Sequence, residues 1–207
     1  MATSGEANET VGATTWATLG SRVAAALVKR RVPLTSAFFV AMVALGFAAG
    51  VQPRDLTSLQ DPQTLAGLSL VLAGAAIRSW AAGTLRKHAE LTTVGPYSLM
   101  RNPLYAGSMM MMVGFCVLVG QFSMAWVVAP IFTLLFGVAV MHEEAKLRAQ
   151  YGAAWDSYAK STPRVIPRRL IVHAGAWSLK QWKKNREYQA TLAACLGLVL
   201  IQAWQIL

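Results

Sequence analysis

The chain has 207 residues, of which 55% are hydrophobic and 14% are charged, and it carries a net charge of +10 at pH 7. A soluble domain usually has about 25% charged residues, so these charges are too few to cover a water-soluble globule. Since the apolar residues also come in long runs, the composition excludes a disordered chain, a coiled coil and a secreted disulfide scaffold. It predicts an all-α integral membrane protein.

Residues 1–32 come first and are expected to form a cytoplasmic tail that ends in an interfacial helix over 13–31. No cleavable signal peptide is expected in this tail. Residues 33–207 form the expected membrane domain, in which each apolar run is close to the ~20 residues that cross a bilayer. The sequence therefore predicts five transmembrane helices over residues 34–51, 65–85, 104–120, 124–141 and 190–207.

The basic residues predict the orientation of these spans. Seventeen of the 19 lysines and arginines flank the spans on one side, Arg54 lies on the other side, and Arg78 lies within the second span. Positive charge collects in cytoplasmic loops, so the N-terminus is predicted to be cytoplasmic and the C-terminus to face the other side. Residues 86–103 and 142–188 then form a cytoplasmic region, which could contact anionic lipid. Arg78 either snorkels to the interface or faces a polar cavity.

The first cytoplasmic segment leads into the third predicted span. Gly95 and Pro96 are typical of a turn, and Asn102 with Pro103 is typical of a helix N-cap and its first residue. A helix that begins at a membrane surface offers free amides to an anion. The alternative is a plain connecting loop.

The second cytoplasmic segment continues the fourth span, and we expect that helix to run through Gln150. Glu143 and Glu144 lie where it leaves the membrane, and they either face solvent or line a polar pocket. Glu144 and Arg148 have the spacing of an ion pair on one helix. The spacing also predicts one helical face made of Leu147, Tyr151, Trp155 and Tyr158.

Together the two segments resemble the isoprenylcysteine carboxyl methyltransferase family, within a wider group that includes the membrane phospholipid N-methyltransferases. The similarity covers roughly residues 65–170. It is carried by GPYSLMRNPLYAG at 95–107, by the EE pair at 143–144, and by the GAAWDSYAKSTPRVIP stretch at 152–167. The sequence departs from the family pattern at Asn102, where the isoprenylcysteine enzymes have histidine.

The resemblance implies an S-adenosylmethionine-dependent methyltransferase whose lipophilic acceptor enters from the bilayer. The Ala-rich composition looks bacterial, which points to the inner membrane. The reaction expected is O-methylation of a carboxylate such as an isoprenylcysteine-like acid. The alternatives are a phospholipid-type N-methyltransferase, an NADPH enzyme like the sterol reductases, and a non-enzymatic membrane subunit or binding module that keeps the fold. A homodimer is compatible with the small-residue faces of the first two spans.

The chemistry of the methyl donor suggests roles for the polar residues. A glutamate would pair with the donor ammonium, helix amides and Arg101 would bind its carboxylate, and aromatic rings would contact adenine or the sulfonium. A carboxylate acceptor would need a cation, Arg148 or Arg164, and an amine acceptor would need a glutamate base. No metal site is predicted. The candidate cofactor-binding residues are His88, Gly95, Tyr97, Arg101, Asn102, Pro103, Tyr105, Glu143, Glu144 and Tyr158, and the candidate catalytic residues are Glu144, Arg148 and Arg164.

Overall fold

The computed structural model describes residues 37, 40–41, 43–87, 90–120 and 122–207. The predicted tail, the predicted interfacial helix over 13–31 and much of the first predicted span lie outside these residues. Within that span, residues 43–48 are helical.

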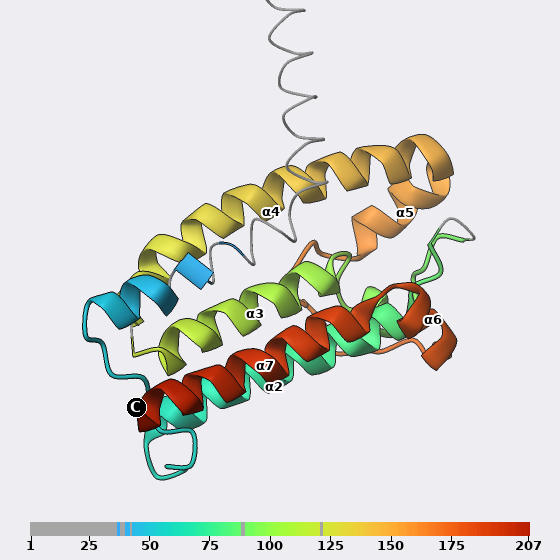
Figure 1. Cartoon of the computed structure of the whole chain (residues 1–207). Coiled ribbons are helices and arrows are strands. Elements are labelled where there is room, and N and C mark those ends of the chain that lie inside the picture. Colours follow the sequence, from blue (N-terminus) through green and yellow to red (C-terminus); the bar gives the residue numbers. More distant parts are fainter. Residues whose placement is uncertain (1–36, 38–39, 42, 88–89, 121) are drawn as a thin grey trace, which may run out of the picture.

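The described part of the chain is helical and contains no strand, so the all-α prediction is confirmed. Figure 1 shows the longer helices running roughly alongside one another. The helices are α2 (Pro62–Thr84), the 3-10 turn η1 (Gly95–Ser98), α3 (Pro103–Leu118), α4 (Phe122–Tyr151), α5 (Ala153–Ser161), α6 (Leu179–Lys184) and α7 (Glu187–Ile206).

Three of the described helices are long and apolar enough to cross a membrane, namely α2, α4 and α7. They correspond to the second, fourth and fifth predicted spans. The third predicted span is the shorter apolar helix α3, of 16 residues. The helix α4 continues past the apolar run to Tyr151, as expected, and Pro130 lies inside it without ending it.

Local signals explain where these helices begin and end. Asp61 caps α2, because its side chain accepts a hydrogen bond from the Gln63 amide at 3.1 Å, and Pro62 supplies the fixed φ of a first helical residue. Gly152 ends α4 with a φ of +51°, in the left-handed region that favours glycine. The chain folds back there into α5 (Figure 1), so the single helical face predicted from Leu147 to Tyr158 is wrong.

The closest packing in the described residues is between α2 and α3, and glycines make it possible. A Cβ added to Gly74 would lie 2.5 Å from the Gly107 carbonyl oxygen, and one added to Gly114 would lie 2.8 Å from the Gly67 carbonyl oxygen. Two backbones can approach this closely only where side chains are absent. The small-residue face of α2, on which the expected homodimer partly depended, is therefore used inside the molecule.

Replacing Gly74 with alanine should destabilise the protein by about 1–3 kcal/mol, because the new methyl group overlaps the backbone of α3. The matched control is Gly137→Ala in α4, where no atom of the described residues lies within 4 Å of the added Cβ. Alanine there should be neutral or stabilising, because glycine costs up to about 1 kcal/mol in a helix interior. Unfolding of both variants in mild detergent measures the difference, and equal effects at the two positions would contradict the packing argument.

α7 lies antiparallel to α2, with polar contacts at both ends of the pair. At one end Arg78 of α2 pairs with Glu187 of α7, and at the other the Leu56 amide donates to the Gln202 side chain at 2.8 Å. Between these ends the apolar core joins α2, α3, α4 and α7 through Val71, Phe115, Leu118, Phe132 and Ile201.

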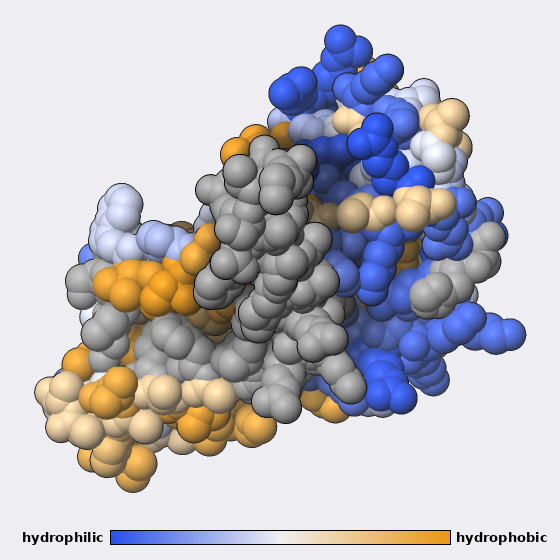
Figure 2. Space-filling model, turned by 90° about the horizontal axis from the view of Figure 1, so that it is seen from above, coloured by the Kyte–Doolittle hydropathy of each residue, from blue (hydrophilic) through white to orange (hydrophobic). Residues whose placement is uncertain are grey.

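The arrangement places both polar segments at the same end of the helices. The connection from α2 to α3 and the stretch from the end of α4 to the start of α7 meet there (Figure 1). Figure 2 shows hydrophilic residues gathered at this end and hydrophobic residues at the other. The predicted separation of charge along the spans is thus present in the fold.

Candidate functional site

Main-chain hydrogen bonds join the two polar segments. The Arg101 amide donates to the Pro163 carbonyl at 2.8 Å, and the Asn102 amide donates to the Arg164 carbonyl at 3.0 Å. The sequence-based expectation that amides near Asn102 are free to bind an anion is therefore wrong for these two groups. They hold the start of α3 against the chain that follows α5.

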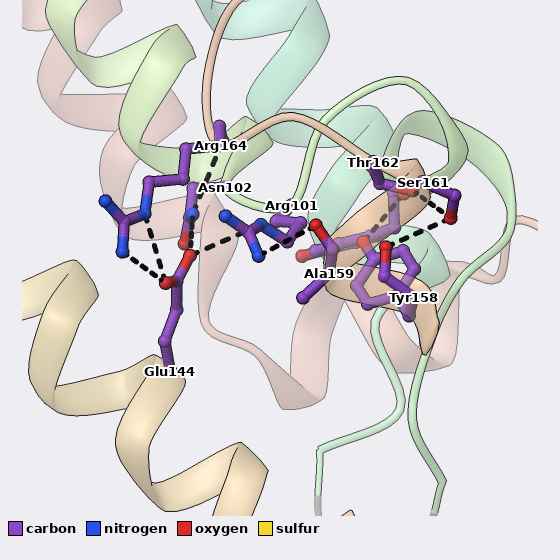
Figure 3. A network of polar contacts seen from close by, with 9 residues as sticks. Arg101, Asn102, Glu144, Tyr158, Ala159, Ser161, Thr162 and Arg164 are labelled. Carbon is purple, nitrogen blue, oxygen red and sulfur yellow. Dashed lines mark hydrogen bonds and ion pairs between the residues drawn. The ribbon is translucent and has the colours of Figure 1, made fainter. Parts of the chain in front are cut away.

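Glu144 connects the same two segments through its side chain (Figure 3). One carboxylate oxygen lies 3.4 Å from Arg101 Nε and accepts a hydrogen bond from Asn102 Nδ2 at 3.4 Å. The other accepts from Arg164 Nε at 3.1 Å and from Arg164 Nη2 at 3.0 Å. With its side chain only 11% exposed, Glu144 is a largely buried anion between two cations. We call Arg101, Asn102, Glu144 and Arg164 the Glu144 network.

Arg101 is held by more than this carboxylate. Its Nη1 donates to the Ala159 carbonyl at 3.3 Å, and its guanidinium carbon lies 5.7 Å from the centre of the buried Trp155 ring. The contact from Nε to Glu144 is an ion pair that lacks hydrogen-bond geometry. α5 thus supplies both a backbone acceptor and an aromatic surface for the cation.

Asn102 lies at the N-cap position of α3, as predicted, but its side chain makes no capping hydrogen bond. Its amide nitrogen points instead to Glu144 and to the Arg164 carbonyl. The helix begins because Pro103 has a suitable φ, and because the Asn102 carbonyl accepts from the amides of Tyr105 and Ala106.

Arg148 does not join the network. Its Nε lies 3.0 Å from the carboxylate of Asp156 on α5, and its side chain is 69% exposed. The predicted pair of Glu144 with Arg148 along one helix is therefore wrong: Glu144 pairs with Arg101 and Arg164 instead. Among the predicted catalytic residues, Glu144 and Arg164 meet and Arg148 lies at the surface.

Glu143, the neighbour of Glu144, points elsewhere because successive residues on a helix are about 100° apart. Its Oε2 accepts a hydrogen bond from the Tyr105 hydroxyl at 3.2 Å. The Tyr105 ring packs against Phe136, with the ring centres 5.3 Å apart. The two glutamates, which the sequence could only treat as a pair, thus have different partners.

Tyr97 and Tyr158 are both buried, and they are linked by a hydrogen bond of 2.7 Å from the Tyr158 hydroxyl to the Tyr97 carbonyl. The Tyr97 hydroxyl has no hydrogen-bond partner among the described residues. Burial raises the pKa of the Tyr97 phenol far above its ordinary value, and the charge of Glu143 raises it further. Burial also raises the pKa of Tyr158. Both phenols are therefore neutral at physiological pH.

An orphaned hydroxyl in a buried site is costly unless a ligand or water meets it. The charge of Glu143 acts on Tyr97, and the Glu143 carboxylate accepts from the hydroxyl of Tyr105, so an anionic acceptor and an aromatic residue accompany the buried phenol. These groups fit a ligand that carries a cation and hydrogen-bonding atoms, which describes S-adenosylmethionine.

Gly95 and His88 are the remaining predicted cofactor-binding residues. Gly95 has a φ of +61°, and its amide donates to the His173 carbonyl at 2.8 Å, so it forms a turn that the later chain covers. His88 lies outside the described residues.

Sequence reasoning missed the partner of Arg78. This arginine donates from Nε and Nη2 to the two carboxylate oxygens of Glu187, at 2.8 and 2.9 Å, and it also contacts the Ser108 hydroxyl. The structure therefore places Arg78 in an ion pair between α2 and α7, which neither sequence-based interpretation had described. A possible signal was Glu187 itself, a lone carboxylate just before the last apolar run.

Comparison with known proteins bears on this site. Residues 62–154 match the family model of the phospholipid methyltransferases. This range includes α2, η1 and α3, and it extends through α4 to the start of α5. It therefore contains the first polar segment and both glutamates. No solved structure matches the chain.

Three curated proteins are similar over parts of their length. The chain is 29% identical over 67% of its length to the nickel-cobalt-cadmium resistance protein NccN of Alcaligenes xylosoxydans xylosoxydans, covering 69% of that protein. It is 33% identical over 53% of its length to the cobalt-zinc-cadmium resistance protein CzcN of Cupriavidus metallidurans, covering 49% of that protein. It is 29% identical over 51% of its length to a protein-S-isoprenylcysteine O-methyltransferase of Schizosaccharomyces pombe, covering 44% of that protein.

These matches and the apolar helices support a membrane methyltransferase. The resemblance seen in the motifs is confirmed by the family model and by the yeast enzyme. Residues 62–154 are thus similar to the phospholipid methyltransferases, and about half of the chain is similar to an isoprenylcysteine methyltransferase.

Proposed function

We propose that the protein is an S-adenosylmethionine-dependent methyltransferase of the bacterial inner membrane that acts on a lipophilic acceptor. Five spans, a cytoplasmic N-terminus and a C-terminus on the other side complete the proposed topology. The observation that carries the proposal is the contact of Glu144 with Arg101, Asn102 and Arg164, which joins the two polar segments into one site.

The cofactor supplies an electrophilic methyl group when bound, and the protein residues bind and orient the reacting groups. Glu143 would pair with the ammonium of the donor, while its carboxylate also accepts from the Tyr105 hydroxyl. The Tyr97 hydroxyl would donate to a donor oxygen or nitrogen, since burial keeps it protonated. The Glu144 network would fix the wall of the pocket and does not itself need to touch the donor.

The acceptor is proposed to be a carboxylate, as in an isoprenylcysteine-like acid. A carboxylate is already ionised at neutral pH and needs a cation to orient it. Arg164 is the better candidate of the two predicted arginines, because it is part of the network and its side chain is still 57% exposed. Positioning the acceptor in line with the methyl group would supply much of the rate.

A phospholipid-type N-methyltransferase is the second candidate, and the family model that matches residues 62–154 favours it. An amine acceptor would have to lose a proton, and Glu143 would be the base. Incubation with labelled donor and a lipid extract, followed by mass spectrometry of the methylated product, separates the two candidates.

Replacing Glu143 with glutamine should weaken binding of S-adenosylmethionine by about 10- to 100-fold, the range expected for one lost charged hydrogen bond. The fold should remain, because glutamine still accepts from the Tyr105 hydroxyl. Calorimetry on the full chain in lipid nanodiscs measures the dissociation constant.

The control for this prediction is Glu90→Gln, which removes a carboxylate from an exposed pair with Arg86. Its donor affinity should equal that of the unaltered protein. If the unaltered protein bound NADPH and not S-adenosylmethionine, the proposed function would be wrong. If Glu143→Gln bound the donor normally, only the role of Glu143 would be wrong.

A further inference from the structure

A segment without helix or strand crosses the polar end of the molecule between α5 and α6. We call residues 163–178 the strap. A structureless connection of this length is uncommon in a compact domain unless it has a function. Its two ends are bonded to the fold, whereas residues 165–172 in its middle form no hydrogen bond or ion pair with any other described residue.

The first end of the strap is bonded to the start of α3 through the carbonyls of Pro163 and Arg164. The second end is bonded to η1 and α2. The His173 amide donates to the Ser98 hydroxyl at 3.0 Å, and Trp177 Nε1 donates to the Ser79 carbonyl at 3.1 Å. The Ser178 amide also donates to the Gly83 carbonyl at 3.0 Å.

These hydrogen bonds fix the position of the strap along the axes of the helices. Ser79 and Gly83 lie near the C-terminal end of α2, and α2 is one of the helices able to cross a membrane. The other attachment is at the two residues that directly precede the apolar helix α3. Both ends of the strap therefore lie where apolar helices end, which is the level of a membrane–water interface.

The middle of the strap exposes large apolar side chains at this level. Ile166 is 80% exposed, Leu170 is 85% exposed and Ile171 is 64% exposed. Single exposed apolar residues are common, but several within six positions form an apolar patch whose exposure to water is unfavourable. No described residue covers them.

The same stretch carries positive charge. Arg168 and Arg169 lie between the apolar residues, and neither forms an ion pair with a described carboxylate. The helix that follows the strap, α6, adds Lys183 and Lys184 in its last turn. Apolar side chains interleaved with arginines complement the acyl boundary and the phosphates of an anionic lipid surface.

We propose that residues 165–172 of the strap insert into the headgroup layer of an anionic membrane. The side chains of Ile166, Leu170 and Ile171 enter the acyl boundary, and Arg168 and Arg169 pair with lipid phosphates. The proposal needs no methyl transfer, so it stands independently of the proposed function.

The test measures how deeply the strap lies in the membrane. The full chain, with Cys116 and Cys195 replaced by alanine, receives a spin label at Leu170→Cys or, as a reference exposed on α5, at Ala154→Cys. Each protein is placed in nanodiscs of phosphatidylcholine alone or with about one third phosphatidylglycerol. Relaxation by oxygen, which partitions into lipid, is compared with relaxation by a water-soluble nickel chelate.

We expect the label at position 170 to favour oxygen over nickel in the anionic discs, and the label at 154 to favour nickel in both. In the variant Arg168→Gln/Arg169→Gln, the preference of the label at position 170 for oxygen over nickel should fall by at least about half, because two contacts with lipid phosphates are gone. The charge-matched control, Lys146→Gln/Lys160→Gln, removes two exposed cations outside the strap and should keep it.

Two results would overturn the proposal. Equal access of nickel at positions 170 and 154 in anionic discs would place the strap in water. Protection of position 170 from both oxygen and nickel would show that protein covers the strap, either another copy or another part of this chain.

Discussion

Replacing Glu144 with glutamine should unfold the protein at a markedly lower temperature and weaken donor binding. The change leaves the largely buried Arg101 without its counter-ion and removes the charge that holds Arg164. Removing one partner of a buried ion pair costs roughly 3–5 kcal/mol. We expect the lower end of that range, because the Arg164 side chain is 57% exposed and water compensates it in part.

The measurement is the unfolding midpoint in mild detergent, followed by calorimetry with S-adenosylmethionine at a temperature where the variant is folded. Glu90→Gln is again the matched control. Its pair with Arg86 is exposed on both sides, so it should change stability by less than about 0.5 kcal/mol. Equal stability of Glu144→Gln and Glu90→Gln would contradict the role of Glu144 as the link between the two polar segments.

Replacing Arg78 with methionine should be as damaging, and a second substitution should repair it. The single variant leaves Glu187, whose side chain is 6% exposed, as an unpaired carboxylate at the start of α7, a helix long and apolar enough to cross a membrane. The expected cost is roughly 3–5 kcal/mol. Adding Glu187→Leu removes the remaining charge, and apolar replacement of a whole buried pair is often neutral or stabilising.

A double-mutant cycle over Arg78→Met, Glu187→Leu and the combination measures the coupling between the two side chains. Ser108 does not lose its only partner in these variants, because its hydroxyl also donates to the Leu104 carbonyl at 2.8 Å. If the double variant were as unstable as the sum of the single ones, the pair would not be the contact that fixes α7 to α2.

The helices were accessible from the sequence because their signals are local. Asp61 with Pro62 starts α2, Asn102 with Pro103 starts α3, and apolar runs set the lengths. The two polar segments were also identifiable, because most of the charged residues lie in them. Gly152 carried a local signal too, since a glycine between two helical patterns commonly ends the first. It was outweighed by the periodicity of Leu147, Tyr151, Trp155 and Tyr158.

The partners within the site were not accessible, because they depend on how the helices are rotated and shifted against one another. The spacing of Glu144 and Arg148 predicted a local pair, but the tertiary structure brings Arg101 and Arg164 closer to Glu144. The amides expected to be free at Asn102 are covered by a strap that lies 62 residues further along the chain. A local sequence pattern contains no information on interaction partners that lie far away along the chain.

The sequence by itself determined an all-helical membrane protein with its charge gathered in two segments, because burial in lipid demands apolar runs and internally bonded backbone. Only the tertiary structure decided that Glu144 links those segments while Glu143 contacts Tyr105, and that Arg78 meets Glu187 across 109 residues. The close approach of α2 and α3 at Gly74 and Gly107 sets the register of those two helices. Register is a property of packed surfaces, so no single segment of the chain could reveal it.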